Sequence, residues 1–441
     1  MPVDPIAPRP PGDEKPLLLP DDVVFTCQNC GACCRHDWLI GVDTAAAERL
    51  RGVEWAHVDP ALPPGDKFVR LPLPLASGET TTFARTPDGA CVFLTADARC
   101  SIHRHLGASA KPQVCREFPY YFVETPDGVA VGVSFACTAV RGHHGRSLPD
   151  QQPEIVDVLR GSTRVNRVPD PIVLYSGLDI AWDDYRPIET ALLDVLAITD
   201  QPLARLLIAG SVLVSLSVSL RQVERRAHEA GRPPAETLAS GLAQLRADGY
   251  RRLLDVAAAV RSPRRATLAY LAPFYAWLEL SRQKLSRGAL VWALYRNYFR
   301  FRKGRGRLPD LVTNGAPIDL DAVHRVRFTV DAETDAFLRE YWRHVVFRKT
   351  LTPMHGVFRG YHTMLALHGF TRWAAKVIAL RAGRAATTVA DVKDAVRLVE
   401  QRFVLHSQFG NVFAVSTVLT VLADRLFGQP SFVPATVLES N

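Results

Sequence analysis

Length, composition and charge already exclude several kinds of protein. A chain of 441 residues is too long for one ordinary hydrophobic core, so we expect two domains, and its hydrophobic share of 47% is typical of soluble globular proteins. Its net charge of +8 is uneven, because residues 1–145 hold 13 Lys and Arg against 17 Asp and Glu, whereas residues 146–441 hold 40 against 28. No apolar run reaches the ~18–20 residues of a membrane span, so we expect no transmembrane segment.

Residues 1–23 predict a flexible, proline-rich tail. The segment lacks the basic start and the apolar core of a secretory signal peptide. We therefore expect a cytoplasmic protein. In a reducing cytosol, clustered cysteines bind metal more often than they form disulfides.

Residues 24–140 predict a small mixed α/β domain. Thr44–Leu50 has the apolar spacing of a helix. Tyr120–Glu124 and Val129–Phe135 flank an Asp-Gly turn, which predicts a β-hairpin. Residues 141–170, rich in Gly, His, Pro, Asp and Gln, predict a linker with one short helical patch.

Residues 171–441 predict an almost entirely helical domain. Apolar residues recur at three-and-four spacing, and Thr388 with Asp391 predicts a capping box at one helix start. The predicted helices are Glu189–Ile198, Leu203–His228, Ala235–Val260, Arg264–Leu285, Gly288–Phe301, Ala332–Phe347, Val357–Ala382, Val389–Leu405 and Phe409–Leu426. The fold class that we expect is therefore α+β and mostly α, with a small cysteine-cluster domain followed by a large all-α domain.

All eight cysteines lie in the first third of the chain, which indicates a local binding site rather than a disulfide network. Cys-x2-Cys spacing aims two thiolates at one ion, and Gly31 permits the backbone angles that such a turn needs. Thiolates are soft ligands that select zinc or iron–sulfur clusters over magnesium or calcium. We favour an iron–sulfur cluster, of the 4Fe-4S type, over zinc. The candidate metal ligands are Cys27, Cys30, Cys33, Cys34, Cys91, Cys100, Cys115 and Cys137.

The number of metal sites stays open at this point. Eight thiolates fill two four-ligand sites, or one site with spare thiols. Neighbouring side chains of an extended backbone point to opposite sides, so we expect only one of Cys33 and Cys34 at the main centre. The other would face a second site or the core. His103 and His105 lie between two cysteines, where we favour a solvent-facing or supporting role over ligation.

The cysteine pattern resembles a known family. The matching segments are Cys27-x2-Cys30-x2-Cys33-Cys34, Cys91-Val-Phe-Leu, Cys100-Ser-Ile and Pro112-Gln-Val-Cys115-Arg-Glu-Phe-Pro. They are similar to the YkgJ-type CxxCxxCC cysteine-cluster family, which is described as zinc- or iron-chelating. The resemblance covers Phe25–Cys137, about a quarter of the chain. Lys111 and His103 stand where the family usually has Arg and Tyr.

That family includes the bacterial flagellin lysine N-methylase, which this chain also resembles in Cys33–Ile40, in total length and in its long helical half. The resemblance implies a metal-dependent enzyme that transfers a methyl group from S-adenosylmethionine to a lysine of a flagellin-like protein substrate. Such an enzyme needs a group that deprotonates the lysine. The candidates closest to the cysteines in sequence are His36, Asp37, His103, Tyr120 and Tyr121. The common Gly-rich nucleotide motif is absent, so S-adenosylmethionine would bind in an unconventional way.

A non-catalytic protein is the alternative. Zinc or an iron–sulfur cluster would then stabilise the fold of the N-terminal domain, while the helical domain binds a partner. Residues 296–307 interleave six cationic residues with three aromatic ones. We favour their interpretation as a helix end with a solvated basic loop over their interpretation as a nucleic-acid or anionic-lipid site. We therefore expect no nucleic-acid partner and at most a peripheral membrane contact.

Overall fold

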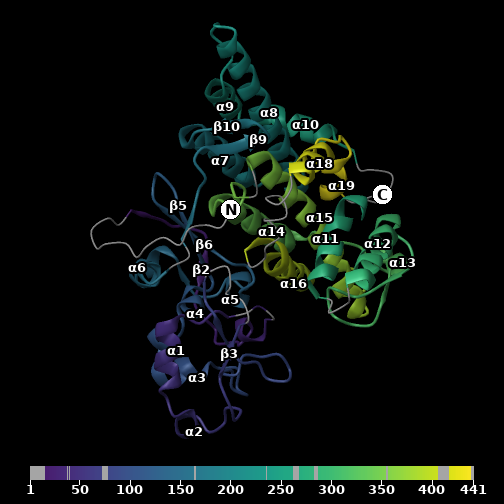
Figure 1. Ribbon diagram of the computed structural model, residues 1–441. Coiled ribbons are helices and arrows are strands. Elements are labelled where there is room, and N and C mark those ends of the chain that lie inside the picture. Colours follow the sequence, from purple (N-terminus) through teal and green to yellow (C-terminus); the bar gives the residue numbers. More distant parts are fainter. Residues whose placement is uncertain are drawn as a thin grey trace. The chain divides into compact units, whose positions relative to one another are not determined.

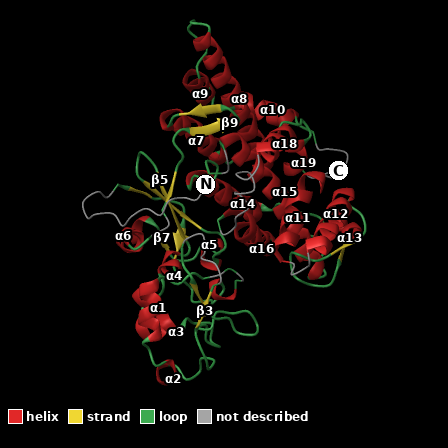
Figure 2. Cartoon of the chain, in the orientation of Figure 1, coloured by secondary structure: helices red, strands yellow, loops and turns green. Residues whose placement is uncertain are grey.

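A computed structural model describes residues 15–36, 38, 40–71, 78–162, 165–234, 236–261, 268–282, 287–353, 356–405 and 417–438. The chain divides into two compact units, residues 1–167 and 168–441 (Figure 1). The first unit is small and mixed α/β, and the second is large and mostly helical (Figure 2). The predicted fold class is therefore confirmed.

A four-stranded sheet organises part of the first unit, in the order β1-β6-β5-β8. Its centre is the predicted hairpin, in which Tyr120 pairs with Val133 and Glu124 with Val129. The backbone N–H of Thr125 donates to the Gly128 carbonyl at 2.8 Å and closes the turn. The strands of this unit are β1 (Leu17–Leu18), β2 (Val24–Phe25), β3 (Phe68–Arg70), β4 (Thr81–Phe83), β5 (Tyr120–Glu124), β6 (Val129–Val133), β7 (Arg146–Ser147) and β8 (Asn166–Arg167).

Short helices surround a second, apolar core in this unit. The predicted helix over Thr44–Leu50 is present, and it turns Ala46, Ala47 and Leu50 toward Phe83 and Phe93. Asp43 caps its N-terminus, because its carboxylate accepts from the Ala46 N–H at 2.8 Å. The helices are η1 (Cys33–Arg35), α1 (Thr44–Arg51), α2 (Trp55–Val58), α3 (Ser101–Leu106), η2 (Ala108–Ala110), α4 (Gln113–Glu117), α5 (Thr138–Arg141), η3 (Pro149–Gln151) and α6 (Gln152–Arg160).

The segments predicted as tail and linker carry strands of the first unit. β1 runs parallel to β6, β7 pairs with β2, and β8 runs parallel to β5. Each of these strands has only two residues, too few to show an alternating pattern in the sequence. The domain limits after residues 23, 140 and 170 stay predictions.

The second unit is a bundle of helices with two small hairpins. Its helices are α7 (Trp182–Ala197), α8 (Leu203–Glu229), α9 (Leu238–Ala247), α10 (Arg251–Ala259), α11 (Leu268–Arg282), α12 (Arg287–Lys303), α13 (Leu320–Arg325), α14 (Ala332–Phe347), α15 (Val357–Arg381), α16 (Val389–Val399), the π-helical turn η4 (Glu400–Val404), α18 (Thr417–Phe427) and α19 (Phe432–Val437). Its strands are β9 (Ile172–Tyr175), β10 (Leu178–Ile180), β11 (Arg307–Leu308) and β12 (Ile318–Asp319). The first part of the predicted helix over Phe409–Leu426 lies outside the described residues.

α8 packs against α15 in the core of the second unit. The Tyr361 hydroxyl of α15 donates to the Leu207 carbonyl of α8 at 2.9 Å, beside Gly210. Within the described part of the chain, α8 is also the one helix long and apolar enough to cross a membrane. Because 67% of its most apolar stretch is buried inside the protein, its burial is that of a core helix.

Three predicted helices differ clearly from those in the structure. The helix predicted over Glu189–Ile198 is α7, which already starts at Trp182. The helix predicted over Ala235–Val260 is two helices, because Gly249 and Tyr250 take φ angles of +64° and +60°. Tyr250 is held there by its hydroxyl, which donates to Asp194 at 2.7 Å. The helix predicted over Val389–Leu405 starts at its capping box but widens into a π-turn at Glu400. There the Glu400 carboxylate accepts two hydrogen bonds from the buried guanidinium of Arg348, at 2.6 and 2.9 Å.

Candidate metal centre

The segment from Cys27 to Cys34 is a loop that ends in a short 3-10 helix. Cys27 and Cys30 are exposed in the loop, and η1 begins at Cys33. Gly31 has a φ angle of +66°, as its predicted role requires. A Cβ atom on this residue would lie 2.7 Å from Nη1 of Arg35 and 2.9 Å from Cδ1 of Leu94. Glycine therefore lets the loop lie close against these two side chains.

Cys33 and Cys34 have sulfur atoms only 3.9 Å apart. The extended backbone that we assumed for them is wrong, because successive side chains of a 3-10 helix are about 120° apart rather than opposite. Cys34 packs against the apolar core of the unit. The hydrogen bond between the thiols lowers the pKa of Cys33 to about 7 and, together with burial, raises the pKa of Cys34.

Three cysteines distant in sequence join this pair. The Cys91 N–H donates to the Cys34 carbonyl at 2.8 Å, and a β-bridge joins Leu94 to Cys100. The thiols of Cys91 and Cys115 interact electrostatically with each other and with their neighbours. We call the resulting group the five-thiol cluster; its members are Cys33, Cys34, Cys91, Cys100 and Cys115.

Burial favours the protonated thiols of Cys91 and Cys115 when no cation is bound. Loss of solvent raises the pKa of Cys91 to about 11 and raises the pKa of Cys115 well above its ordinary value. A bound metal cation has the opposite effect, because it stabilises a thiolate directly. The cluster is therefore a place where a soft cation would displace protons from sulfur.

The other three cysteines lie in the loop and beside α5. The Cys137 thiol interacts electrostatically with Cys33 and Cys27, and burial raises its pKa to about 11. Cys30 is exposed between Cys27 and Cys33. Within the described ranges, no three His, Cys, Asp or Glu side chains already converge on one ion-binding point. The eight ligands and their partition between sites therefore stay predictions.

The candidate groups for deprotonating a lysine have varied surroundings. His36 is buried edge-on against Trp38, with ring centroids 4.3 Å apart, and Tyr120 packs against Phe25. Burial raises the pKa of Tyr120 to about 12. Burial, with a contribution from the Lys111 charge, lowers the pKa of His103. Asp37 lies outside the described residues.

His105 lies beside a carboxylate, and Tyr121 lies in the β5–β6 hairpin. His105 faces Asp59, with Nε2 3.4 Å from the carboxylate, and Ser101 donates to the same carboxylate at 2.7 Å. Tyr121 lies in β5 opposite Gly132 of β6. His105 therefore supports α3 rather than the thiols, in keeping with the supporting role that we favoured.

Arg85 holds the cysteine loops together, and sequence reasoning missed it. Its guanidinium donates to the carbonyls of Cys34 at 3.2 Å and Gly89 at 3.1 Å, and also to the carbonyl of Trp38. It therefore joins η1, the segment after it and the turn before Cys91. The signal in the sequence is weak, since Arg85 is one basic residue before a Thr-Pro-Asp-Gly turn.

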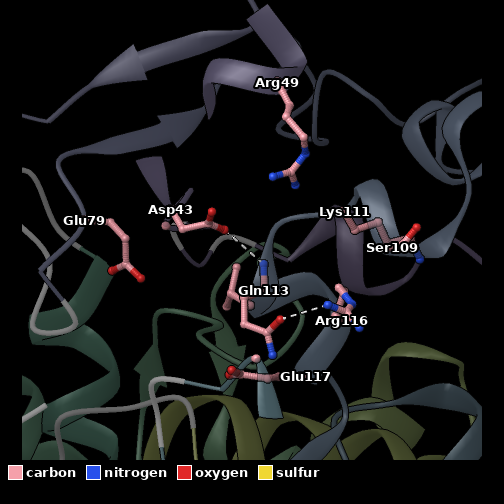
Figure 3. A pocket seen from close by; sticks show the side chains of 11 residues that line it. Asp43, Arg49, Glu79, Ser109, Lys111, Gln113, Arg116 and Glu117 are labelled. Carbon is pink, nitrogen blue, oxygen red and sulfur yellow. Dashed lines mark hydrogen bonds between the residues drawn. The ribbon is translucent and has the colours of Figure 1, made fainter. Parts of the chain in front are cut away.

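The first unit has a pocket of about 380 Å³ next to the segment that carries Cys115. Figure 3 shows the side chains that line it. That segment is α4, which carries both Cys115 and four residues of the pocket wall. The Gln113 N–H donates to Asp43 at 3.2 Å, and Arg116 donates to the Gln113 side chain at 3.3 Å. The charged residues of the wall are Arg49, Lys111 and Arg116 and, of opposite sign, Asp43, Glu79 and Glu117. The pocket therefore offers both signs of charge to a ligand.

Lys111 belongs to both the pocket and the surroundings of the thiols. It lines the pocket, and its charge acts on Cys33 and Cys115. In the part of the chain that the structure describes, neither Lys111 nor Arg49 forms an ion pair with a carboxylate. Both cations are therefore open to an anionic group in the pocket.

Residues 26–133 match one family model, described as "CxxCxxCC: Putative zinc- or iron-chelating domain". The match supports the family resemblance and a zinc- or iron-chelating cysteine cluster in this part of the chain. No curated protein and no solved structure matches the chain. The finer likeness to the flagellin methylase stays a prediction.

Proposed function

We propose that the first unit binds a metal centre through cysteine thiolates, with an iron–sulfur cluster favoured over zinc. The observation that carries this proposal is the five-thiol cluster, whose thiols come from four segments and act electrostatically on one another, and of which all but Cys33 pack on one apolar core. The donor set is sulfur alone, which suits zinc and iron–sulfur clusters and does not suit hard cations. Cys27 and Cys30, in the exposed loop, are further candidate ligands of the centre.

The finer proposal is an S-adenosylmethionine-dependent protein lysine N-methyltransferase. The likeness of Cys33–Ile40 to the methylase supports it, and so does the pocket beside Cys115. S-adenosylmethionine supplies the methyl group. The chain's own residues must bind a lysine side chain and leave its amine unprotonated, since an ammonium has no lone pair. The carboxylates of the pocket suit the incoming ammonium, while Lys111 and Arg49 suit an anionic group of a ligand.

The test of the metal centre begins with anaerobic purification of the full chain, an absorption spectrum, and iron, sulfide and zinc analysis. We expect a brown protein with iron and acid-labile sulfide. A colourless protein with stoichiometric zinc would instead support the zinc-stapled, non-catalytic alternative. A protein that holds neither metal would contradict the whole proposal.

Ligand substitutions then test the assignment. Cys30→Ala and Cys115→Ala should each lose bound metal and destabilise the first unit, because each removes one thiolate. Ser109→Ala, in the pocket wall, is the matched control and should keep the metal. Full metal content in both cysteine variants would contradict the assignment.

Methyl transfer is tested with the metal-loaded protein, S-adenosylmethionine and lysine-containing protein substrates, flagellin among them. We expect a mass increase on lysine that depends on the cofactor and is lost in Cys115→Ala. Glu117→Gln, which removes a pocket charge but no thiol, should weaken methylation while keeping the metal. If the metal-loaded protein methylates none of these substrates, the methyltransferase proposal is contradicted, whereas the proposal of a metal centre is not affected.

A further inference from the structure

One face of α12 carries aromatic and basic side chains together. Its residues recur at three-and-four spacing, so they lie on the same side of the helix. Trp292 is 63% exposed and Tyr295 58% exposed, which is unusual for side chains of this size. We call this surface the aromatic–basic face; it consists of Trp292, Tyr295, Arg296, Phe299, Arg300 and Lys303.

The opposite face of α12 is anchored in the second unit. The Asn297 amide donates to the buried carboxylate of Glu279 on α11 at 2.6 Å. Phe301 is buried, stacked on Tyr275 with ring centroids 4.8 Å apart and edge-on to Trp373 at 4.9 Å. Because these contacts fix the rotation of the helix, the aromatic rings on the other side stay exposed in the folded protein.

The exposed rings form a continuous row. The rings of Trp292 and Tyr295 are stacked at 6.0 Å with an interplanar angle of 18°, and Tyr295 meets Phe299 at 4.6 Å. Single exposed hydrophobic residues are normal on a protein surface, but a contiguous apolar patch usually marks an interaction site. The row therefore indicates a surface that is covered by a partner.

The sequence segment that carries this face contains basic residues and no acidic ones. Residues 280–309 contain nine Lys and Arg and no Asp or Glu. This exceeds the net charge of +8 of the whole chain, so all other residues together sum to −1. The partner that covers the face is therefore negatively charged.

We propose that the aromatic–basic face docks on an anionic phospholipid surface. Trp and Tyr rings favour the headgroup level of a bilayer, where their polar edges stay wet and their apolar parts are buried. Arg and Lys beside them bind the lipid phosphates, and the exposed Arg305 and Arg307 extend the contact past the helix end. A single straight helix face suits a flat surface.

Two other anionic partners fit the face less well. Single-stranded nucleic acid stacks its bases on open ring faces, whereas Trp292 and Tyr295 each turn one face toward the other ring. An acidic protein segment would bind to the basic residues, but binding of such a segment does not explain the row of exposed aromatic rings. The membrane surface accounts for both the rings and the charges.

The experiment measures binding of the full chain, as purified, to sedimented vesicles. We expect binding to phosphatidylcholine vesicles that contain phosphatidylglycerol, little binding to phosphatidylcholine alone, and weaker binding at higher salt. The emission of Trp292, obtained by subtracting the spectrum of Trp292→Phe from that of the wild type, should shift to shorter wavelength on binding. Equal binding to both kinds of vesicle, or to neither, would overturn the proposal.

Variants of the face complete the test. Arg296→Gln with Arg300→Gln should weaken binding about 25-fold, because each basic residue near an anionic surface contributes about fivefold. Trp292→Ala should weaken it about tenfold. The control is Arg226→Gln with Arg232→Gln, an exposed pair at the end of α8 with no neighbouring row of rings, which should bind almost as the wild type does.

The controls also separate the other partners. If both double variants lose binding equally, net charge alone is responsible and the proposal fails. It also fails if the wild type binds a single-stranded oligonucleotide or a poly-glutamate peptide more tightly than the anionic vesicles, with the same dependence on Trp292. Circular dichroism of each variant confirms that the helices are retained.

Discussion

Gly31 lies where the cysteine loop passes the side chains of Arg35 and Leu94. Replacing Gly31 with any other residue would cost free energy for two separate reasons, its left-handed backbone and the short distances around an added Cβ. The first is conformational and the second is steric. Both act on the loop that carries Cys27, Cys30 and Cys33, and neither involves a sulfur atom.

Gly31→Ala should therefore reduce metal binding although all eight thiols remain. We expect a loss of about 2–4 kcal/mol in the stability of the loop, from left-handed strain and overpacking together. Metal content after gel filtration is the measurement. Gly65→Ala is the control, since Gly65 also has a positive φ angle of +96° but nothing lies within 4 Å of an added Cβ. Equal metal content in both variants would contradict the role of Gly31.

His362 is a buried neutral histidine in the helical unit. Its Nδ1–H donates to the Phe358 carbonyl at 2.7 Å, and its Nε2 lies 3.0 Å from the Ser211 hydroxyl. Burial lowers its pKa to about 4. Both ring nitrogens have partners in the neutral form, so His362 stabilises the helix packing rather than holding a metal.

The acid sensitivity of the helical unit follows from this pKa. The pKa of His362 in the folded state lies below its unfolded value of about 6.5, so between these two values the unfolded state binds more protons. The contribution of His362 to the free energy of unfolding is therefore complete above about pH 6.5 and decreases as the pH falls toward 4. We expect the loss from His362 to approach about 3 kcal/mol. Urea unfolding on both sides of this window measures it. His362→Gln should reduce the dependence and leave the part due to His368, whose pKa burial lowers to about 3, whereas His228→Gln, at an exposed site on α8, should leave it unchanged.

The crossing of α8 and α15 depends on the absence of one side chain. A Cβ on Gly210 would lie 2.1 Å from the Tyr361 hydroxyl and 2.8 Å from the ring carbon that carries it. In an exposed helix, replacing glycine with alanine stabilises, by about 1 kcal/mol. At this crossing the steric conflict outweighs that gain.

Gly210→Ala should therefore destabilise the helical unit, by about 2 kcal/mol, and break the hydrogen bond from Tyr361 to Leu207. Thermal unfolding is the measurement. Gly52→Ala, at the end of α1, should be neutral or slightly stabilising, because the nearest atom to its Cβ is at 3.5 Å. An unchanged melting temperature for Gly210→Ala would mean that the two helices can move apart freely.

Elements with a long repeating pattern were predictable from the sequence, and contacts between distant residues were not. The periodic helices α8, α14 and α15 lie within one residue of their predicted limits. The break at Gly249 and Tyr250 depends on a hydrogen bond to Asp194, which no local pattern shows. In the same way, cysteine spacing predicted a metal-binding segment, but the association of Cys91 with Cys34 comes from a backbone contact across 57 positions. Arg85 and the pocket were missed for that reason.

At the scale of the whole molecule, cysteines and charge are segregated. All eight cysteines lie in the first unit, and the uninterrupted positive segment around α12 lies in the second. The chemistry of the thiols is therefore confined to one folded body. The packing of the other rests on apolar contacts and on buried ion pairs such as Arg348 with Glu400.

Removal of the metal should therefore affect one unit and spare the other. We expect chelation to increase hydrogen exchange in peptides from residues 26–133, because structural metal binding contributes directly to folding. Peptides from α8 and α15 should keep their protection. Mass spectrometry of exchanged peptides provides the measurement. A uniform rise across both units would show that the helical unit depends on the metal centre.

The same separation has a practical consequence for anyone preparing this protein. Most of its helix belongs to the unit without cysteines, so far-ultraviolet circular dichroism reports chiefly on that unit. A sample that has lost its metal to air or to a chelator would pass as well folded by that criterion and would elute as ordinary protein. The metal-to-protein ratio is therefore a better criterion for the integrity of the first unit than its circular dichroism.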